Sequence, residues 1–151
     1  MEAGETVADF ALQDQDGTER RLQELLAAGP VVLFFYPAAM TRGCTAETCH
    51  FRDLAGEFAA VGAQPVGISA DPVGRQEEFA RAHGVGFPLL SDPDRRVAAQ
   101  FGVRRRLGPL PVKRSTFVID TDQRVLEVVH SELKMDRHAD TALEVLRRPR
   151  T

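Results

Sequence analysis

The sequence predicts an α/β fold in which a mixed central sheet is covered by helices on both faces. Apolar, β-branched runs alternate with stretches whose apolar residues recur at helical spacing. The run 31–36 is continuously apolar, as expected of a strand buried on both faces, and 65–69 is a second apolar strand. Two later runs, 115–120 and 124–130, are separated by a short turn and predict an antiparallel hairpin, which makes the sheet mixed.

The first third of the chain predicts three short elements. Residues 10–12, followed by the polar stretch 14–17, predict a strand and a turn. A short helix is expected over 22–28, because a Gly-Pro pair follows and ends it. The run 31–36 is then the first buried strand.

The next stretch predicts a longer helix over 45–61. Its apolar residues recur at helical spacing, at Phe51, Leu54, Ala55, Phe58 and Val61. Gly62 ends this helix, and 65–69 forms the second buried strand. Because strand–crossover–strand connections are right-handed, the strands 31–36 and 65–69 are expected to be parallel neighbours.

Two more helices are expected before the hairpin. One covers 73–82, with Asp71 as a plausible N-cap ahead of Pro72 at the first helical position. The other covers 95–101 and ends at Gly102.

The C-terminal third adds the hairpin and an amphipathic helix over 136–147. The resulting order of strands and helices is the layout of a thioredoxin-like fold. A length of 151 residues fits a single domain over 1–151. A chain of this size can bury about two-thirds of the surface its unfolded form exposes, so it needs no disulfide or structural metal to fold.

Composition argues against some classes of function. The net charge is −3, which gives no reason to expect nucleic-acid binding. The arginine clusters 104–106 and 147–150 are interpreted as solvated surface or a frayed end. The acidic N-terminal residues lack a signal pattern, and the longest apolar run, 30–40, is far short of the ~20 residues that cross a bilayer. We therefore expect a cytoplasmic protein without a membrane partner.

The two cysteines, Cys44 and Cys49, are five positions apart. In a reducing cytosol such a pair is more often catalytic, redox-sensing or metal-binding than structural. Cys44 is expected in the first helical turn after the strand 31–36, at the carboxyl end of that strand. The helix dipole and the first-turn N–H groups favour the thiolate there, which is the nucleophilic form. The alternative is that Cys44 is a small buried hydrophobe.

Two other thiol chemistries fit the sequence poorly. The Cys-x-x-Cys motif of thioredoxin-type reductases is absent. A structural zinc site usually needs four ligands. Cys44, Cys49 and His50 supply at most three, so they do not form such a site by themselves. We therefore expect no metal site, and we interpret the four histidines as surface or structural residues.

The segment 34–53 carries the most specific signal and reads FFYPAAMTRGCTAETCHFRD. It resembles the active-site segment of peroxiredoxins, in particular the bacterioferritin-comigratory or peroxiredoxin Q group, whose mark is a second cysteine five residues after the first. The resemblance extends, in the family's order, through 4–12, 67–71, 87–92 and 114–120. It implies a thioredoxin-like fold and thiol-dependent peroxidase activity.

The resemblance implies a role for each of five residues. Cys44 would be the peroxidatic cysteine. Thr41 would hydrogen-bond the thiolate and the peroxide, and Pro37 would shield the thiolate from water. Arg114 would stabilise the thiolate and polarise the peroxide. Glu47 resembles a supporting carboxylate that orients the arginine.

Each of these roles has a plainer alternative. Pro37 could simply end a strand, and Thr41 could be an ordinary turn or cap residue. Arg114 could be a surface arginine, and Glu47 could complement the helix dipole. One residue departs from the family pattern, since Arg42 stands where proline is usual. The arginine is expected to change the rigidity of this loop and the substrate preference. The alternative is that Arg42 only points to solvent and has little effect.

The resemblance further implies a complete reaction. The Cys44 thiolate attacks a hydroperoxide and becomes a sulfenic acid, with which Cys49 condenses to an intramolecular disulfide. A dithiol reductant, thioredoxin, then reopens the disulfide, and no metal or organic cofactor is required. A monomer or weak dimer is expected. Two alternatives are a peroxide-sensing thiol–disulfide relay protein and a scaffold that keeps the fold without redox chemistry.

Overall fold

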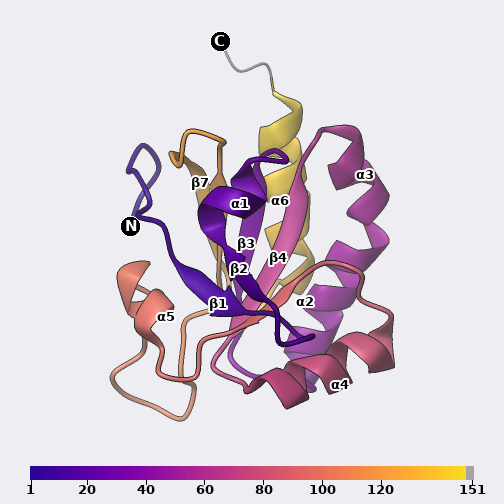
Figure 1. Cartoon of the computed structure of the whole chain (residues 1–151), viewed down its shortest axis with the longest axis vertical. Helices are drawn as coiled ribbons and strands as arrows, with labels where there is room; N and C mark the ends of the chain where they lie inside the picture. Colours follow the sequence, from indigo (N-terminus) through magenta and orange to yellow (C-terminus); the bar gives the residue numbers. More distant parts are fainter. Residues whose placement is uncertain (149–151) are drawn as a thin grey trace.

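The computed structural model describes residues 1–148 and contains a seven-stranded sheet with helices packed against it (Figure 1). The strands are β1 (Ala11–Gln13), β2 (Glu19–Arg21), β3 (Val31–Phe35), β4 (Gln64–Ser69), β5 (Leu89–Ser91), β6 (Ser115–Ile119) and β7 (Val125–His130). The helices are α1 (Leu22–Leu26), α2 (Arg42–Asp53), α3 (Ala55–Ala60), α4 (Val73–His83), α5 (Arg96–Gln100) and α6 (Met135–Arg147).

The sheet is mixed, as the sequence predicts. Its strand order is β2-β1-β5-β4-β3-β6-β7. The strand β3 is parallel to β4, and β4 is parallel to β5. On the other side of β3, the strand β6 is antiparallel to it and forms a hairpin with β7. Every residue of β3 and β6 is buried, and burial on both faces explains the continuous apolar sequence of β3.

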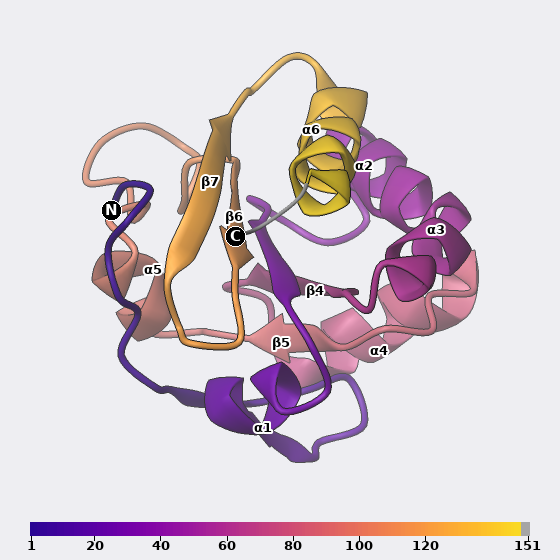
Figure 2. The same cartoon turned by 90° about the horizontal axis from the view of Figure 1, so that it is seen from above.

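Helices cover both faces of the sheet, so two separate cores form. Alternate residues of β3 point into opposite cores, because side chains alternate along a strand. Leu33 packs with the core beneath α1 and α5. Phe34 packs with the core beneath α2, α3, α4 and α6, and its ring stacks on Phe51 of α2 at a centroid distance of 4.2 Å. Figure 2 shows these two helical layers on opposite sides of the strands.

The helix predicted over 45–61 is in fact two helices. The first, α2, begins three residues earlier than predicted, and Leu54 separates it from α3. The apolar periodicity continues across the break because both helices pack against the same core, where the rings of Phe51 and Phe58 stack. The short strands β2 and β5 were not predicted from the sequence. The strand β2 consists of three charged residues at the sheet edge, which carry no apolar pattern.

The prediction that Asp71 caps α4 is wrong. The N-cap position belongs to Pro72. The Asp71 carboxylate instead accepts the Ala39 N–H at 2.7 Å and the Ser69 hydroxyl at 2.6 Å. It therefore holds the loop between β3 and α2 rather than the start of α4.

The two arginine clusters lie at the surface wherever they are described. In the cluster 104–106, Arg105 pairs with Glu132 at 3.1 Å and its two neighbours are exposed. In the cluster 147–150, the first two arginines form exposed ion pairs, and residues 149 and 150 lie outside the described residues. None of the helices within residues 1–148 combines the length and apolar character needed to cross a membrane.

Candidate active site

Cys44 lies in the first turn of α2, where the sequence places it. The helix begins at Arg42 with Thr41 as its N-cap residue, directly after the loop that leaves the carboxyl end of β3. The Cys44 side chain is fully buried, and both cysteines are free thiols. Cys44 is the third residue of this twelve-residue helix, and the N-terminal turn of a helix favours an anion.

Arg114 lies beside this thiol because of the order of the strands. It immediately precedes β6, whose first residue, Ser115, pairs with Phe35 at the end of β3. Its guanidinium donates from Nη2 to Cys44 Sγ at 3.2 Å and from Nη1 to Glu47 Oε1 at 2.6 Å. One planar guanidinium thus contacts both the sulfur and the carboxylate.

Arg114 remains a cation in this buried position. Burial lowers the pKa of Arg114, but the interactions with Glu47 and Cys44, hydrogen bonds included, outweigh burial and raise this pKa above its ordinary value. A permanent positive charge therefore lies 3.2 Å from Cys44 Sγ.

Glu47 shares the buried face of α2 with Cys44. The two residues are three positions apart, so they are neighbours on the helix surface. Glu47 is fully buried, and burial raises the pKa of its carboxyl to about 8, although Arg114 opposes this shift. Its second oxygen, Oε2, is 3.6 Å from His138 Nδ1 and has no hydrogen-bond partner among the described residues.

Pro37 and Thr41 lie in the loop between β3 and α2. Pro37 is buried and directly follows the fully buried Tyr36. Thr41 is exposed, and its hydroxyl donates to the Ala38 carbonyl oxygen at 2.7 Å. Since a hydroxyl has one proton, Thr41 does not donate to Cys44 in this arrangement, and it keeps its lone pairs free to accept a hydrogen bond.

Cys49 lies on the same continuous helix as Cys44 and is partly exposed. Five residues of helix correspond to about 140° of rotation, so the two side chains leave α2 in different directions. The departure from the family pattern, Arg42, is the first residue of α2 and is exposed.

Two residues near the thiol were not singled out from the sequence. Gly43 packs so closely that a Cβ atom would meet Arg114 Nη2 at 3.3 Å and Met135 Cε at 3.6 Å. His138 is fully buried beside Glu47. One signal for His138 is present in the sequence: it precedes the buried Ala142 by four residues and so lies on the apolar face of its helix.

A buried hydrogen-bond network supports the loop that carries Pro37 and Thr41. The Tyr36 hydroxyl donates to Gln76 Oε1, and Gln76 Nε2 donates to Ser69 Oγ at 2.9 Å. The Ser69 hydroxyl in turn donates to Asp71, which accepts the Ala39 N–H. The loop between β3 and α2 is therefore fixed by polar side chains of three segments. Ser69 ends β4, Asp71 precedes α4, and Gln76 lies in the first turn of α4 and binds Tyr36 at the start of the loop.

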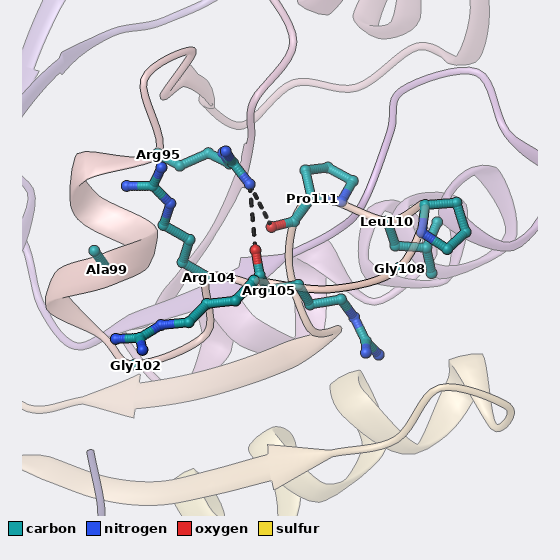
Figure 3. Close-up of a pocket in the computed structure, with 10 residues that line it drawn as sticks. Arg95, Ala99, Gly102, Arg104, Arg105, Gly108, Leu110 and Pro111 are labelled. Atoms are coloured by element: carbon teal, nitrogen blue, oxygen red, sulfur yellow. Dashed lines mark hydrogen bonds between the residues drawn. The ribbon is translucent and has the colours of Figure 1, made fainter.

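Two cavities lie on the side of the site where Arg114 and the loop 104–111 meet the surface. A cavity of about 460 Å³ is lined by Arg114, His130 and Glu132, among others. A larger cavity of about 810 Å³ lies along the loop 104–111, where the Arg95 guanidinium donates to two backbone carbonyl oxygens (Figure 3). Within residues 1–148, no group of three or more His, Cys, Asp or Glu side chains is arranged to hold a metal ion.

Comparison with known proteins identifies the family. The model of the AhpC/TSA family matches residues 3–128. The chain belongs to this family. A crystal structure of peroxidoxin BcpB from Mycobacterium tuberculosis is 64% identical and superimposes with a TM-score of 0.95, covering 100% of this chain and 99% of that one. A chloroplastic peroxiredoxin Q of Sedum lineare is 38% identical over 144 residues, covering 95% of this chain and 76% of that protein.

A third similar protein is a bacterioferritin comigratory protein. The bacterioferritin comigratory protein of Xanthomonas campestris is 32% identical, with a TM-score of 0.83 over 91% of this chain and 89% of that chain. The resemblance read from the sequence is therefore confirmed: this member of the AhpC/TSA family fits the peroxiredoxin Q group and has the thioredoxin-like fold. It is a thiol-dependent peroxidase.

Proposed function

We propose that Cys44 is the peroxidatic nucleophile and that Arg114 makes it reactive. The observation that carries this proposal is the guanidinium that donates to Cys44 Sγ at 3.2 Å while Glu47 holds its other edge at 2.6 Å. A hydroperoxide is the substrate class. The solved structures of the Xanthomonas campestris relative concern its alkyl peroxide reduction activity, so organic hydroperoxides are included with hydrogen peroxide.

In the first step the Cys44 thiolate attacks the terminal oxygen of ROOH. An S–O bond forms, the O–O bond breaks, and RO⁻ leaves and takes a proton to become an alcohol or water. The sulfur is oxidised to sulfenic acid. Arg114 stabilises the charge as it moves from sulfur to the leaving oxygen, and the N–H groups at the start of α2 add to this stabilisation.

Thr41 and Pro37 complete the pocket in this proposal. The Thr41 hydroxyl has free lone pairs beside the helix start and would accept a hydrogen bond from the peroxide O–H. To donate to the thiolate it would have to leave the Ala38 carbonyl, its present acceptor. The buried Pro37 has no N–H and keeps water from that side of the sulfur.

The second half of the cycle restores the thiol. The Cys49 thiolate attacks the sulfenic sulfur of Cys44, an S–S bond forms, and the oxygen leaves as water. A dithiol reductant, thioredoxin, then gives two electrons by thiol–disulfide exchange and becomes a disulfide itself. This chemistry needs a reducing compartment, so we also propose a cytoplasmic location. We further propose that the chain is one domain, 1–151, and that it acts as a monomer or weak dimer.

A coupled assay tests this function. The protein is mixed with thioredoxin, thioredoxin reductase and NADPH, and NADPH consumption is followed with hydrogen peroxide and with an organic hydroperoxide. Continuous consumption that Cys44→Ser abolishes is expected. A single stoichiometric oxidation without turnover would instead favour the peroxide-sensing relay protein.

A further inference from the structure

The buried face of α6 brings a histidine to the peroxidatic site. His138 Nε2 lies 2.8 Å from the Ser131 carbonyl oxygen, and His138 Nδ1 lies 2.7 Å from Thr116 Oγ1. A carbonyl oxygen only accepts hydrogen bonds, so Nε2 must carry a proton. In the neutral ring Nδ1 is then an acceptor, and the Thr116 hydroxyl donates to it. Burial lowers the pKa of His138, which favours this neutral ring.

The nitrogen Nδ1 also faces the second carboxyl oxygen of Glu47. The distance between His138 Nδ1 and Glu47 Oε2 is 3.6 Å, and Oε2 is buried without a hydrogen bond to any described residue. An ionised carboxylate with one unpaired buried oxygen is costly. A proton on Oε2 removes the charge. The nearby Nδ1, whose single lone pair accepts from Thr116, offers an ionised Oε2 no donor.

The charges around Arg114 give this proton a consequence for the thiol. Arg114 supplies one positive charge and donates to two acidic residues, Cys44 and Glu47. If both were ionised, the buried group would carry a net negative charge, and two anions would share one cation. If Glu47 is protonated, the full charge of the guanidinium acts on the thiolate.

The other charged groups around the pair are few. Glu132 lies across the start of β6, where its carboxylate accepts the Arg114 backbone N–H at 2.9 Å and pairs with Arg105. Its negative charge opposes ionisation of Glu47, whereas the cation Arg114 favours it, and His130 on β7 acts on His138. Burial, the largest effect, and Glu132 therefore both favour a neutral Glu47.

We propose that His138 is a positioning residue that keeps Glu47 as a neutral carboxylic acid, so that Arg114 directs its whole charge at the Cys44 thiolate. The proton stays on Glu47 Oε2 when Cys44 loses its own proton, and no redox step is involved. This inference rests on the proposed role of Cys44.

The test replaces the acceptor at Nδ1 by a donor. His138→Asn places an amide near the Nδ1 position, where its NH₂ group can donate to Oε2 and favour an ionised Glu47. In the Cys49→Ser background, the rate of Cys44 alkylation by iodoacetamide is followed against pH. The midpoint of thiolate formation should rise by about one pH unit, the effect of one nearby like charge. The same substitution in Glu47→Gln, where residue 47 cannot ionise, should move the midpoint by much less.

A matched control separates this charge effect from helix packing. His50 also links α2 to α6, through Asp140 at 2.7 Å, but it is partly exposed at the surface. His50→Asn should leave the alkylation midpoint unchanged. If His138→Asn shifts the alkylation midpoint equally with Glu47 and with Gln at position 47, the substitution acts through packing and the proposal is overturned. The absence of any shift with Glu47 present would also overturn it.

A second variant decides the question if His138→Asn fails to fold. Glu47→Gln is neutral, like the protonated acid, and should move the midpoint by less than about half a pH unit. A fall of about one unit or more would show that Glu47 is ionised in the native protein and would overturn the proposal. Alkylation needs no peroxide turnover, so a protein without peroxidase activity would defeat the proposed function and leave this test decidable.

Discussion

Arg114 Nη2 lies 3.2 Å from Cys44 Sγ, although the two residues are 70 positions apart in the chain. The contact depends on the position of β6 beside β3, which brings the start of one strand to the end of the other. The reactivity of the thiol is therefore a property of the folded sheet and not of the local cysteine segment alone.

Removal of the guanidinium is the first test of this contact. Arg114→Ala should slow oxidation of Cys44 by ten-fold or more at neutral pH, since one nearby cation shifts a thiol's ionisation by about 1–3 units. Arg114→Lys should recover only part of the rate, because an ammonium lacks the planar pair of donors that reaches both Cys44 and Glu47. Stopped-flow mixing with hydrogen peroxide measures the rate. Wild-type rates in both variants would refute the role of Arg114.

The absence of a side chain at Gly43 should also matter for catalysis. In Gly43→Ala the new Cβ atom would lie 3.3 Å from Arg114 Nη2, so the guanidinium must shift away from the sulfur. We expect a several-fold slower oxidation with little loss of stability. Gly56→Ala in α3 is the control, because its Cβ would meet no atom within 4 Å. It should leave the rate unchanged and stabilise the fold by up to about 1 kcal/mol. Equal rates in both variants would contradict the packing argument.

The buried Glu47 should make stability depend on pH. Burial raises the pKa of this carboxyl to about 8 in the folded protein, from 4.5. The folded state therefore holds a proton that the unfolded state releases, so this contribution to stability is full below about pH 4.5 and is lost as pH rises through 8. Relative to Glu47→Gln, the wild type should lose on the order of a few kcal/mol between about pH 5 and 8. Urea unfolding at several pH values measures this difference. A wild-type stability that stays constant or rises with pH relative to that of Glu47→Gln would mean that Glu47 folds as a carboxylate.

Disulfide formation requires α2 to unwind. Five residues along one helix place the Cα atoms of Cys44 and Cys49 roughly 8.6 Å apart, beyond the ~7 Å that a disulfide tolerates. Amide hydrogen exchange should therefore rise in residues 41–52 after stoichiometric peroxide, while β3, β4 and β6 stay protected. Cys49→Ser should accept one equivalent of peroxide and keep the slow exchange of α2. A Cys44–Cys49 disulfide found by mass spectrometry in a protein whose α2 exchange is unchanged would contradict this account.

The sequence predicted the central strands and most helices because their signals are local. Continuous apolar runs marked β3 and β4, and helical spacing marked α2 and α6. Sequence patterns gave a wrong prediction where tertiary contacts determine the hydrogen-bond partner of a side chain. Asp71 resembles an N-cap in the sequence, but a carboxylate bonds to whichever donor the fold brings near, here the Ala39 N–H.

The candidate site shows the same division. Cys44 was placed in the first turn of a helix because its motif lies between a buried strand and an amphipathic segment. The contact of Arg114 with Glu47, the close approach of Gly43 to Arg114 and the burial of His138 beside Glu47 depend on how α2, α6 and β6 pack. No spacing along the chain specifies these distances. The role of Arg114 was expected only from the family resemblance.

The most direct test of the central claim counts oxidised thiols. Cys49→Ser and the double variant Cys44→Ser/Cys49→Ser are each mixed with one equivalent of hydrogen peroxide, and a dimedone-type reagent traps sulfenic acid for mass spectrometry. The account predicts rapid loss of one equivalent of peroxide with the label at Cys44 in the first variant, and neither peroxide loss nor label in the second. Peroxide loss at near wild-type speed in the variant without Cys44 would contradict it.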